Sequence, residues 1–494
     1  MSEIIVVGAG LAGLAASCHL IGRGHDVLVV ERESLAGGRA GREETEGFVF
    51  DTGPSVLTMP QLIADTLNAV GVELADVLTL RRLDPAYRAV YADGSALRVR
   101  ADHADMRAEI ADASGQSDAA AYDEFTGWLR QLYEAEMSRF IDRNFSTPLD
   151  LVSSPGAAAR LFRLGAFGRL GPAIRRRFTD PRLHRLFSFQ ALYAGLSPND
   201  ALALYAVITY MDTVEGVWYP DGGMHEVPAA LATACEKAGG RIRFGTEVTE
   251  ILRRADTGAV AGVRLADGEK VRADAVVLTP DLPVAYRRLL PELRPPRAVR
   301  HGTYSPSAVV WHLGVRGQVD AEIAHHNIHF GGEWSAAFDA LLREGRLMPD
   351  PSRLVTVPSR TDAGAAPPGC SSMFVLEPVP NLTAGIDWTV ESEPMRERLL
   401  AFLSKAGYPT DIVVERLVTP LDWEQQGMHL GTPFSLAHTF RQTGPFRPAN
   451  FEKRVPGTFF AGSGTVPGVG VPMVLISGKL AADRVGRYLG EVAR

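Results

Sequence analysis

The sequence predicts an α/β fold, with a parallel sheet near the N-terminus and α+β insertions after it, and two observations support this prediction. The first is an apolar run, Ile4–Val7, that predicts a buried strand leading into a tight turn and a helical pattern. The turn holds three glycines: Gly8, Gly10 and Gly13. The second is another apolar strand, Asp26–Val30, which ends at Glu31, close to the roughly 20-residue spacing at which an acid meets a ribose hydroxyl. Together these features indicate a Rossmann-like unit that binds a dinucleotide.

The glycine turn is the part of this unit that we expect to contact phosphate. Without Cβ atoms, its backbone N–H groups and the N-terminus of the next helix can approach a pyrophosphate closely. The alternative is that the glycines only pack a helix onto a strand, but the acid at the right spacing favours binding. The candidate contacts in this unit are Gly8, Gly10, Ala12, Gly13, Glu31 and Arg32.

A Gly-Gly-Arg loop at residues 37–39 lies just beyond the ribose acid and is followed by Phe50–Pro54. Its glycines offer a second close backbone approach, and the Arg39 guanidinium can reach a pyrophosphate or a flavin ring. Here the sequence resembles the flavoprotein superfamily that includes amine oxidases, protoporphyrinogen oxidase and carotenoid desaturases. The resemblance implies the fold with two dinucleotide-binding motifs and FAD as the cofactor, with Gly38, Arg39, Gly53 and Pro54 among its contacts.

Composition limits the class of protein. The chain has 494 residues, of which 46% are hydrophobic and 22% charged, as in a folded protein of two domains. A net charge of −7 argues against nucleic acid as a partner. The three cysteines lie far apart, so we expect a reducing cytosol. We expect neither a signal peptide before the first strand nor a transmembrane helix, because no apolar run is long enough.

The pattern of elements divides the chain into alternating segments. Residues 1–80, 216–282 and 450–494 are predicted to form a discontinuous FAD-binding domain, with a helix over 226–237 and strands at 241–244, 248–253, 260–265 and 275–278. Residues 81–215 and 283–449 are predicted to form a mixed sheet and helical substrate-binding region. The superfamily resemblance implies that the backbone of Val248 faces the adenine. It also implies that the last glycine loop closes over the flavin, with these contacts: Gly462, Gly464, Gly470, Val471 and Pro472.

Several further segments resemble bacterial-type phytoene desaturases specifically. They are residues 189–195, 216–220, 324–331, 378–382 with 387–391, 446–450 and 467–472, so the resemblance covers nearly the whole chain. It implies desaturation of phytoene towards lycopene, in which an allylic CH2–CH2 unit of a long polyene gives a hydride to flavin N5 and loses a proton inside an apolar tunnel. One departure is Val466, where many relatives carry His, and this puts a polar contact at the flavin edge in doubt.

Candidate catalytic and metal-binding side chains are few. Some relatives place a proton-relaying carboxylate where this chain has Asp150, and the alternative for Asp150 is a helix N-cap. His325, His326 and His329 precede two glycines, which predicts a strand leading into a turn rather than one face of a helix. We therefore expect no metal site.

Residues 150–180 are a candidate membrane-associating helical segment. Apolar side chains at helical spacing lie among six arginines: Arg160, Arg163, Arg169, Arg175, Arg176 and Arg177. This composition suits an interfacial helix attracted to anionic lipid, the alternative being an ordinary amphipathic helix with a solvated face. Three glycines and Pro172 predict two short helices here. We expect a cytoplasmic protein bound peripherally to the inner face of the cell membrane, with oxygen or a quinone as electron acceptor.

Other functions of the same scaffold stay open. Within the resembled family they are a carotene isomerase and a desaturase of later or C30 carotenoids. More distant alternatives are an amine oxidase and a flavoprotein that carries prenyl lipids without catalysis. The C-terminal loop 463–466 offers no cysteine for a covalent flavin link, so we expect FAD to be released on denaturation.

Overall fold

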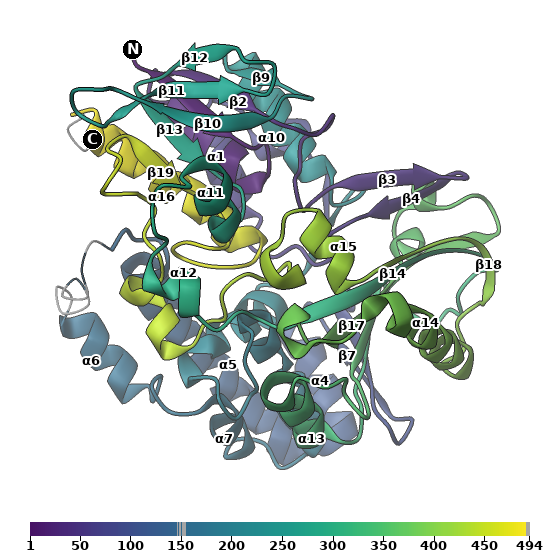
Figure 1. The fold of residues 1–494 in the computed structure, drawn as a ribbon. Coiled ribbons are helices and arrows are strands. Elements are labelled where there is room, and N and C mark those ends of the chain that lie inside the picture. Colours follow the sequence, from purple (N-terminus) through teal and green to yellow (C-terminus); the bar gives the residue numbers. More distant parts are fainter. Residues whose placement is uncertain (146, 148–149, 151–154, 491–494) are drawn as a thin grey trace.

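A parallel five-stranded sheet carries the predicted dinucleotide unit in the computed structural model, which describes residues 1–145, 147, 150 and 155–490. In spatial order its strands are β19 (Thr458–Phe460), β13 (Ala275–Leu278), β1 (Glu3–Val7), β2 (Asp26–Val30) and β9 (Arg241–Arg243). The sheet thus joins segments from the start, the middle and the end of the chain, and Figure 1 shows them side by side. The predicted parallel sheet is confirmed.

Both faces of this sheet are covered, which explains why β1 is apolar at successive positions. Ile4 and Val6 pack into the core shared with the helices α1 (Leu11–Ile21), α10 (Glu226–Lys237) and α16 (Val471–Tyr488). Ile5 and Val7 face the opposite way. They pack with α11 (Leu282–Leu289) and an antiparallel sheet, β10 (Val248–Arg253), β11 (Val260–Leu265) and β12 (Lys270–Arg272).

A second, seven-stranded sheet stands beside the first unit (Figure 1). Its strands, in spatial order, are β18 (Asp411–Val418), β14 (Ser307–Arg316), β17 (Cys370–Val379), β16 (Arg353–Thr356), β15 (His326–His329), β6 (Tyr87–Val90) and β7 (Ala96–Val99). The helix α14 (Trp388–Lys405) buries its apolar side chains against one face of this sheet, where Trp311 and Trp388 share a core. The other face is left to line a cavity.

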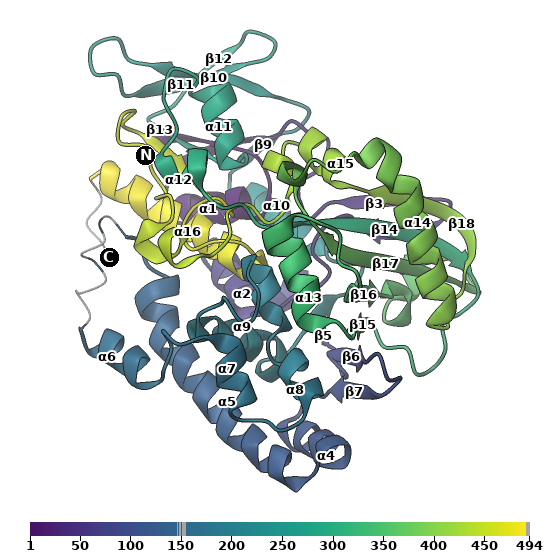
Figure 2. The ribbon, with the colours of Figure 1, turned by 60° about the horizontal axis from the view of Figure 1, so that its bottom comes forward.

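Helices gather below both sheets, as Figure 2 shows. They are α4 (His103–Ser114), α5 (Gln116–Glu136), α6 (Pro155–Arg163), α7 (Leu170–Arg175), α8 (Pro181–Leu186) and α9 (Ala206–Thr209), with π-helical turns η1 (Met137–Ile141) and η5 (Tyr210–Val214) and the 3-10 helix η3 (Phe189–Ala194). The two short helices predicted around Gly165 are α6 and α7, and Gly165 between them has a φ of +72°. That prediction is confirmed.

Smaller elements connect these layers. They are the hairpin β3 (Arg42–Thr45) and β4 (Phe48–Asp51), the pair β5 (Leu80–Arg82) and β8 (Trp218–Pro220), and the helices α2 (Gln61–Asn68), α3 (Leu74–Val77), α12 (Arg297–His301), α13 (Trp334–Asp339) and α15 (Pro420–Gln425). The predicted helix over 226–237 and the strands at 248–253, 260–265 and 275–278 occur with those bounds. The division of the chain into two functional regions stays a proposal.

Candidate cofactor and substrate site

A cavity of about 1220 Å³ runs between the parallel sheet, the second sheet and the helices. It is lined by every residue predicted to contact the cofactor except Gly13. Ligand pockets of drug-sized molecules span roughly 300–1,000 Å³, so this cavity is larger than one drug-sized ligand needs. Because the polar, glycine-rich lining and the apolar lining belong to one cavity, two ligands in it could touch.

The N-terminal turn has the geometry that a phosphate site requires. Gly8 has a φ of +106°, a conformation that favours glycine, and a Cβ there would lie 2.2 Å from Thr279 Oγ1. At Gly10 a Cβ would meet nothing closer than 3.8 Å, so the backbone there borders open cavity. Gly13 differs, since its Cβ would lie 2.0 Å from the Gly8 carbonyl oxygen. Gly13 therefore lets α1 approach β1, and it does not line the cavity.

Glu31 stands at the end of β2 as a buried acid on the cavity wall. Its Oε2 accepts a hydrogen bond from the Ala9 backbone N–H (2.6 Å), and its Oε1 accepts one from the Glu33 N–H (2.9 Å). These bonds fix the carboxylate beside the glycine turn. Val248 also lines the cavity, and its predicted place near an adenine stays a prediction.

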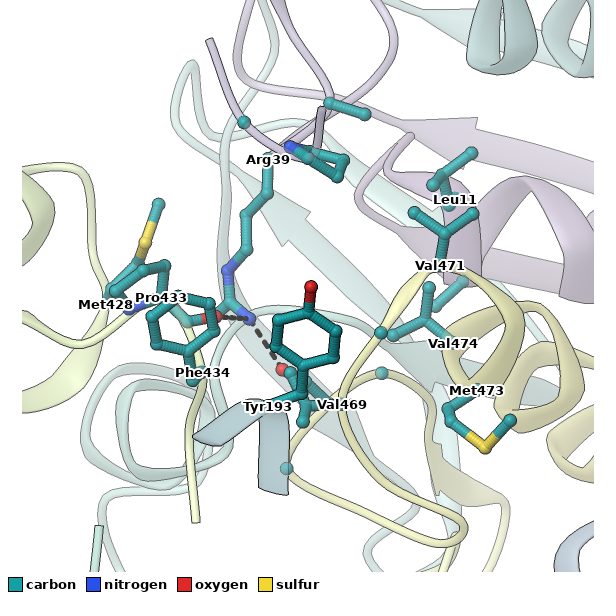
Figure 3. A pocket seen from close by; sticks show the side chains of 18 of the residues that line it. Leu11, Arg39, Tyr193, Met428, Pro433, Phe434, Val469, Val471, Met473 and Val474 are labelled. Carbon is teal, nitrogen blue, oxygen red and sulfur yellow. Dashed lines mark hydrogen bonds between the residues drawn. The ribbon is translucent and has the colours of Figure 1, made fainter. Parts of the chain in front are cut away.

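Arg39 links the Gly-Gly-Arg loop to the far end of the chain. Its Nη1 donates to the Pro433 carbonyl oxygen (3.1 Å) and to Ser463 Oγ (2.5 Å), as Figure 3 shows for the arginine and Pro433. Its Nη2 lies 3.7 Å from the carboxylate of Asp281, a buried residue that sequence reasoning missed. The guanidinium is therefore held by neighbours at the cavity wall, where it can meet a cofactor.

The C-terminal glycine loop faces this arginine across the cavity. Gly462 and Gly470 have φ values of +123° and +113°, and a Cβ at either would meet nothing closer than 3.8 Å. Gly470 precedes α16, so the N-terminus of this helix opens onto the cavity next to Val471 (Figure 3). A helix N-terminus with open glycines suits an anionic or electron-rich ligand group.

A buried arginine in the segment 446–450, which resembles phytoene desaturases, fixes the same loop. Arg447 is 3% exposed and donates to the carbonyl oxygens of Leu436, Gln442, Ser463 and Thr465. Burial lowers its pKa to about 10, so the guanidinium stays charged at neutral pH. Its role is to satisfy carbonyl groups that would otherwise be buried without donors.

His438 is a second cavity residue that sequence reasoning missed. Its imidazole packs against Gly468, where a Cβ would lie 2.1 Å from the ring, and its Nε2 accepts from the Val469 backbone N–H (3.4 Å). Burial lowers its pKa well below the usual value, so the ring is neutral. The chain thus places an imidazole at the C-terminal loop although residue 466 is Val. Because His438 lies 28 residues before Val466, only the folded chain reveals that this imidazole contacts the C-terminal loop.

Most of the remaining wall is apolar, and nearly all of it comes from the two predicted substrate segments. Its wall includes Phe140, Leu161, Phe189, Leu192, Leu204, Ile208, Met211, Ile328, Phe330, Trp334, Phe338, Phe374, Leu376 and Met473. Three further lining residues are exposed, namely Phe167, Phe440 and Phe446. They mark a place where the apolar end of the cavity meets the surface.

Two buried carboxyl groups interrupt this apolar wall. Glu136 is 4% exposed and Asp212 is 2% exposed, and both line the cavity. Burial raises the pKa of each well above its usual value. Neither forms an ion pair with a residue that the structure describes. Both were missed, although an acid between apolar residues of a helical segment is a signal that the sequence offers.

Asp150 lies outside the lining of this cavity. Its Oδ2 accepts from the Thr147 backbone N–H (3.0 Å) and its Oδ1 from the Thr147 hydroxyl (3.4 Å). If Asp150 were a helix N-cap, residues 151–154 would form the first turn of that helix, and they lie outside the described residues. A catalytic role for Asp150 stays a prediction.

The histidines considered for a metal lie on or next to β15, as the sequence predicted. His325 and His326 pair through Nδ1 with the hydroxyls of Thr361 (2.7 Å) and Thr356 (2.9 Å), and His329 pairs with Tyr408 (2.9 Å). Among residues 1–145, 147, 150 and 155–490, no group of three His, Cys, Asp or Glu side chains suits a metal ion.

Comparison with known proteins agrees with the site. The family model of flavin containing amine oxidoreductases matches residues 11–486. A phytoene dehydrogenase of Streptomyces griseus is 51% identical and covers 98% of this chain and 95% of its own. A zeta-carotene-forming phytoene desaturase of Myxococcus xanthus is 38% identical over 98% of this chain and 93% of its own. An oxidoreductase of Methanosarcina mazei has the same fold, with a TM-score of 0.64 at 18% identity, and covers 97% of this chain and 99% of its own.

The fold and the glycine-lined cavity therefore define a flavin-dependent oxidoreductase. The chain belongs to the carotenoid desaturases within the flavin containing amine oxidoreductase family. The residues also fit FAD, because Gly10, Gly462 and Gly470 leave space at the cavity wall that a Cβ would fill. Glu31, at the end of β2, lies where such a unit carries the acid that binds a ribose, and this role stays a prediction.

Proposed function

We propose that this protein desaturates phytoene towards lycopene, with FAD as the oxidant. The observation that carries the proposal is the continuity of one cavity, whose glycine-lined wall fits FAD and whose remaining wall is apolar. A substrate without polar groups needs such a wall and no charged partner. The two relatives at 51% and 38% identity, both named for phytoene, support the same substrate.

The chain's own residues supply position and exclusion of water. The dinucleotide is held by Glu31 and by the glycines at 8, 10, 462 and 470. Arg39 fixes the Gly-Gly-Arg loop between the two ends of the dinucleotide, through its bonds to Pro433 and Ser463. When bound, FAD accepts the hydride that leaves the allylic carbon. Apolar side chains such as Phe189, Ile328 and Phe374 align the polyene, and alignment is a large part of the catalysis that such a site can offer.

Incubation of the FAD-loaded protein with phytoene in liposomes tests the proposal. Desaturation lengthens the conjugated system, so new visible absorbance bands are expected as FAD is reduced under anaerobic conditions.

A shifted cis peak with unchanged conjugation would identify an isomerase instead. Activity only on C30 or later carotenoids would identify a different desaturase. Flavin reduction by an amine but not by phytoene would identify an amine oxidase, and a flavin that phytoene leaves oxidised would point to a lipid carrier. Oxygen and a membrane quinone are the acceptors to compare in the reoxidation step.

We further propose peripheral binding to the inner face of the cell membrane, at the apolar opening of the cavity. Phe162 on α6, next to the cavity residue Leu161, is 75% exposed, and Phe440 at the opening is 58% exposed. Arg163 and Arg441 beside them are exposed, which suits anionic lipid. Several arginines of the predicted cluster have other partners, since Arg160 pairs with Glu134 and Arg177 stacks on Trp128 at 4.0 Å. In the part of the chain that the structure describes, no helix is long and apolar enough to span a bilayer.

Liposome co-sedimentation tests this surface. The double variant Phe162→Ser, Phe440→Ser should bind anionic liposomes less than the wild type does. The control is Val390→Ser, because Val390 is 68% exposed on α14 and lies outside the cavity lining. Unchanged binding of the double variant would contradict membrane docking at this opening.

A further inference from the structure

Desaturation releases a proton as well as a hydride, and the cavity described above contains few groups that could take it. The carbon next to the hydride donor must lose H⁺ while its C–H electron pair becomes the new C=C bond. Inside an apolar cavity, away from bulk water, this proton needs an acceptor on the wall. The inference below rests on the proposed desaturation and names that acceptor.

Asp212 is a buried cavity residue with a free acceptor atom. It lies in the π-helical turn η5, is 2% exposed, and its Oδ2 has no hydrogen-bond partner among the described residues. Buried polar atoms without a partner are rare in folded proteins and call for an explanation. Single π-helical turns are also rare and occur often at functional sites. The position and the unused oxygen therefore point to a ligand in the cavity.

Several polar side chains lie next to Asp212. Its Oδ1 accepts from Gln190 Nε2 (3.3 Å), and Gln190 Oε1 accepts from the Thr209 hydroxyl (3.3 Å). The hydroxyl groups of Tyr87 and Tyr193 interact electrostatically with the carboxyl group. Tyr193 itself lines the cavity between Arg39 and the C-terminal loop residues Val469 and Val471, as Figure 3 shows.

The neighbours of Asp212 also lead away from the cavity. The Tyr87 ring lies 5.6 Å from the His326 ring, centroid to centroid, and both Tyr87 OH and His326 Nε2 lack a hydrogen-bond partner among the residues described. His326 Nδ1 pairs with the Thr356 hydroxyl (2.9 Å), and Thr356 borders a small internal cavity next to Asp51. Burial lowers the pKa of His326 well below its usual value, so its ring stays neutral beside Tyr87.

Glu136 is the competing carboxyl, because it also lines the cavity and its Oε1 also has no hydrogen-bond partner among the described residues. It ends α5 at the turn η1, and α5 contacts η5 where the rings of Tyr133 and Tyr210 lie 4.8 Å apart. The pKa of Glu136 is raised by burial alone, whereas Asp212 also accepts a hydrogen bond from Gln190. Asp212 is preferred because this bond holds its Oδ1 and so defines the position of Oδ2.

We propose that the Asp212 carboxylate is the catalytic base that accepts the proton from the substrate carbon next to the hydride donor. The hydride and its two electrons go to bound FAD, the C–H electron pair of the second carbon forms the C=C bond, and the proton moves to Asp212 Oδ2. Asp212 must release this proton before the next turnover. Because only the ionised carboxyl can act, activity rises with pH.

Steady-state desaturation of phytoene by the FAD-loaded protein, measured between pH 5.5 and 9, tests this role. The wild-type rate should rise about tenfold per pH unit on the acidic side, as expected for a base that must ionise. The titratable groups facing Asp212 are Tyr87 and Tyr193, with Tyr133 and Glu136 on the neighbouring α5. A wild-type rate independent of pH over this range would overturn the proposal without any variant.

Asp212→Asn keeps the size of the side chain and its bond to Gln190, so FAD content and phytoene KM should stay near the wild-type values. Its kcat should fall about 100-fold or more, the usual contribution of a general base, and Asp212→Glu should recover part of the rate. The matched control is Glu136→Gln, an equally buried cavity carboxyl, which should keep the wild-type pH dependence. An equally active Asp212→Asn, or loss of the pH dependence in Glu136→Gln instead, would contradict the assignment. A wild type that leaves phytoene unchanged would contradict the proposed function itself.

Discussion

Gly10→Ala should separate cofactor contact from fold stability. The Gly10 backbone has φ −73° and ψ 170°, which alanine adopts without strain, and an added Cβ would meet no protein atom within 3.8 Å. The apoprotein should therefore keep its free energy of unfolding or gain about 0.4–1 kcal/mol. FAD, in contrast, would meet the new methyl group at the closest point of the turn. Overpacking costs about 1–3 kcal/mol, which corresponds to roughly 5- to 150-fold weaker FAD binding.

Titration of the apoprotein with FAD, followed by flavin fluorescence, measures the affinity, and urea unfolding of the same apoprotein measures stability. Gly127→Ala on α5 is the control, because Gly127 has open space around it and does not line the cavity. Gly13→Ala is the contrast, because its Cβ would lie 2.0 Å from the Gly8 carbonyl oxygen and should destabilise the apoprotein. Wild-type FAD affinity in Gly10→Ala would refute the idea that this turn approaches the cofactor.

Further predictions concern the groups around the cavity. Arg39→Ala removes the bonds to Pro433 and Ser463 and should weaken FAD binding at least about tenfold, as equilibrium dialysis would show. Arg447→Met leaves buried carbonyl groups without a donor and should lower the free energy of unfolding by about 3 kcal/mol; an unchanged urea midpoint would argue against this. Burial lowers the pKa of His312 to about 3 from 6.5. The unfolded chain therefore binds more protons between these values, and stability falls as the pH drops through this window. His312→Leu should reduce the pH dependence of the free energy of unfolding by up to about 1.4 kcal/mol per pH unit. Urea midpoints of the variant and the wild type, compared from pH 4 to 7, measure this difference.

The first unit of the fold could be predicted because its signals are local. The apolar β1, the open glycines and Glu31 lie within one βαβ segment, so spacing alone located them. Spacing did not reveal that Gly13 packs α1 against β1. A glycine that contacts a cofactor and a glycine that lets a helix approach a strand occur in the same sequence pattern. The helix α14 begins at Trp388, because the Asp387 carboxylate accepts a hydrogen bond from the backbone N–H of Thr389. That cap was visible in the sequence.

The rest of the site depends on contacts between distant segments. His438 reaches the C-terminal loop from a segment with no recognisable motif, and Arg447 acts through backbone carbonyls that no residue pattern encodes. Asp212 is different, because an acid among Ile208, Tyr210 and Met211 is unusual in a buried helical stretch. Its burial could have been suspected from the sequence, but its place on the cavity wall could not.

The cofactor site also joins parts of the chain that lie far apart in the sequence. The Gly37 N–H donates to the Ala9 carbonyl oxygen at 2.9 Å, and Arg39 reaches Pro433 and Ser463, so three distant segments meet around one ligand. A ligand that binds only this folded arrangement stabilises it by an amount that grows with the ratio of free ligand to Kd, about 2.7 kcal/mol at a hundredfold excess. The Tm of the wild type should therefore rise with added FAD, whereas that of Gly10→Ala should rise less at the same concentration. Equal shifts in the two proteins would mean that the N-terminal turn does not take part in holding these segments through the cofactor.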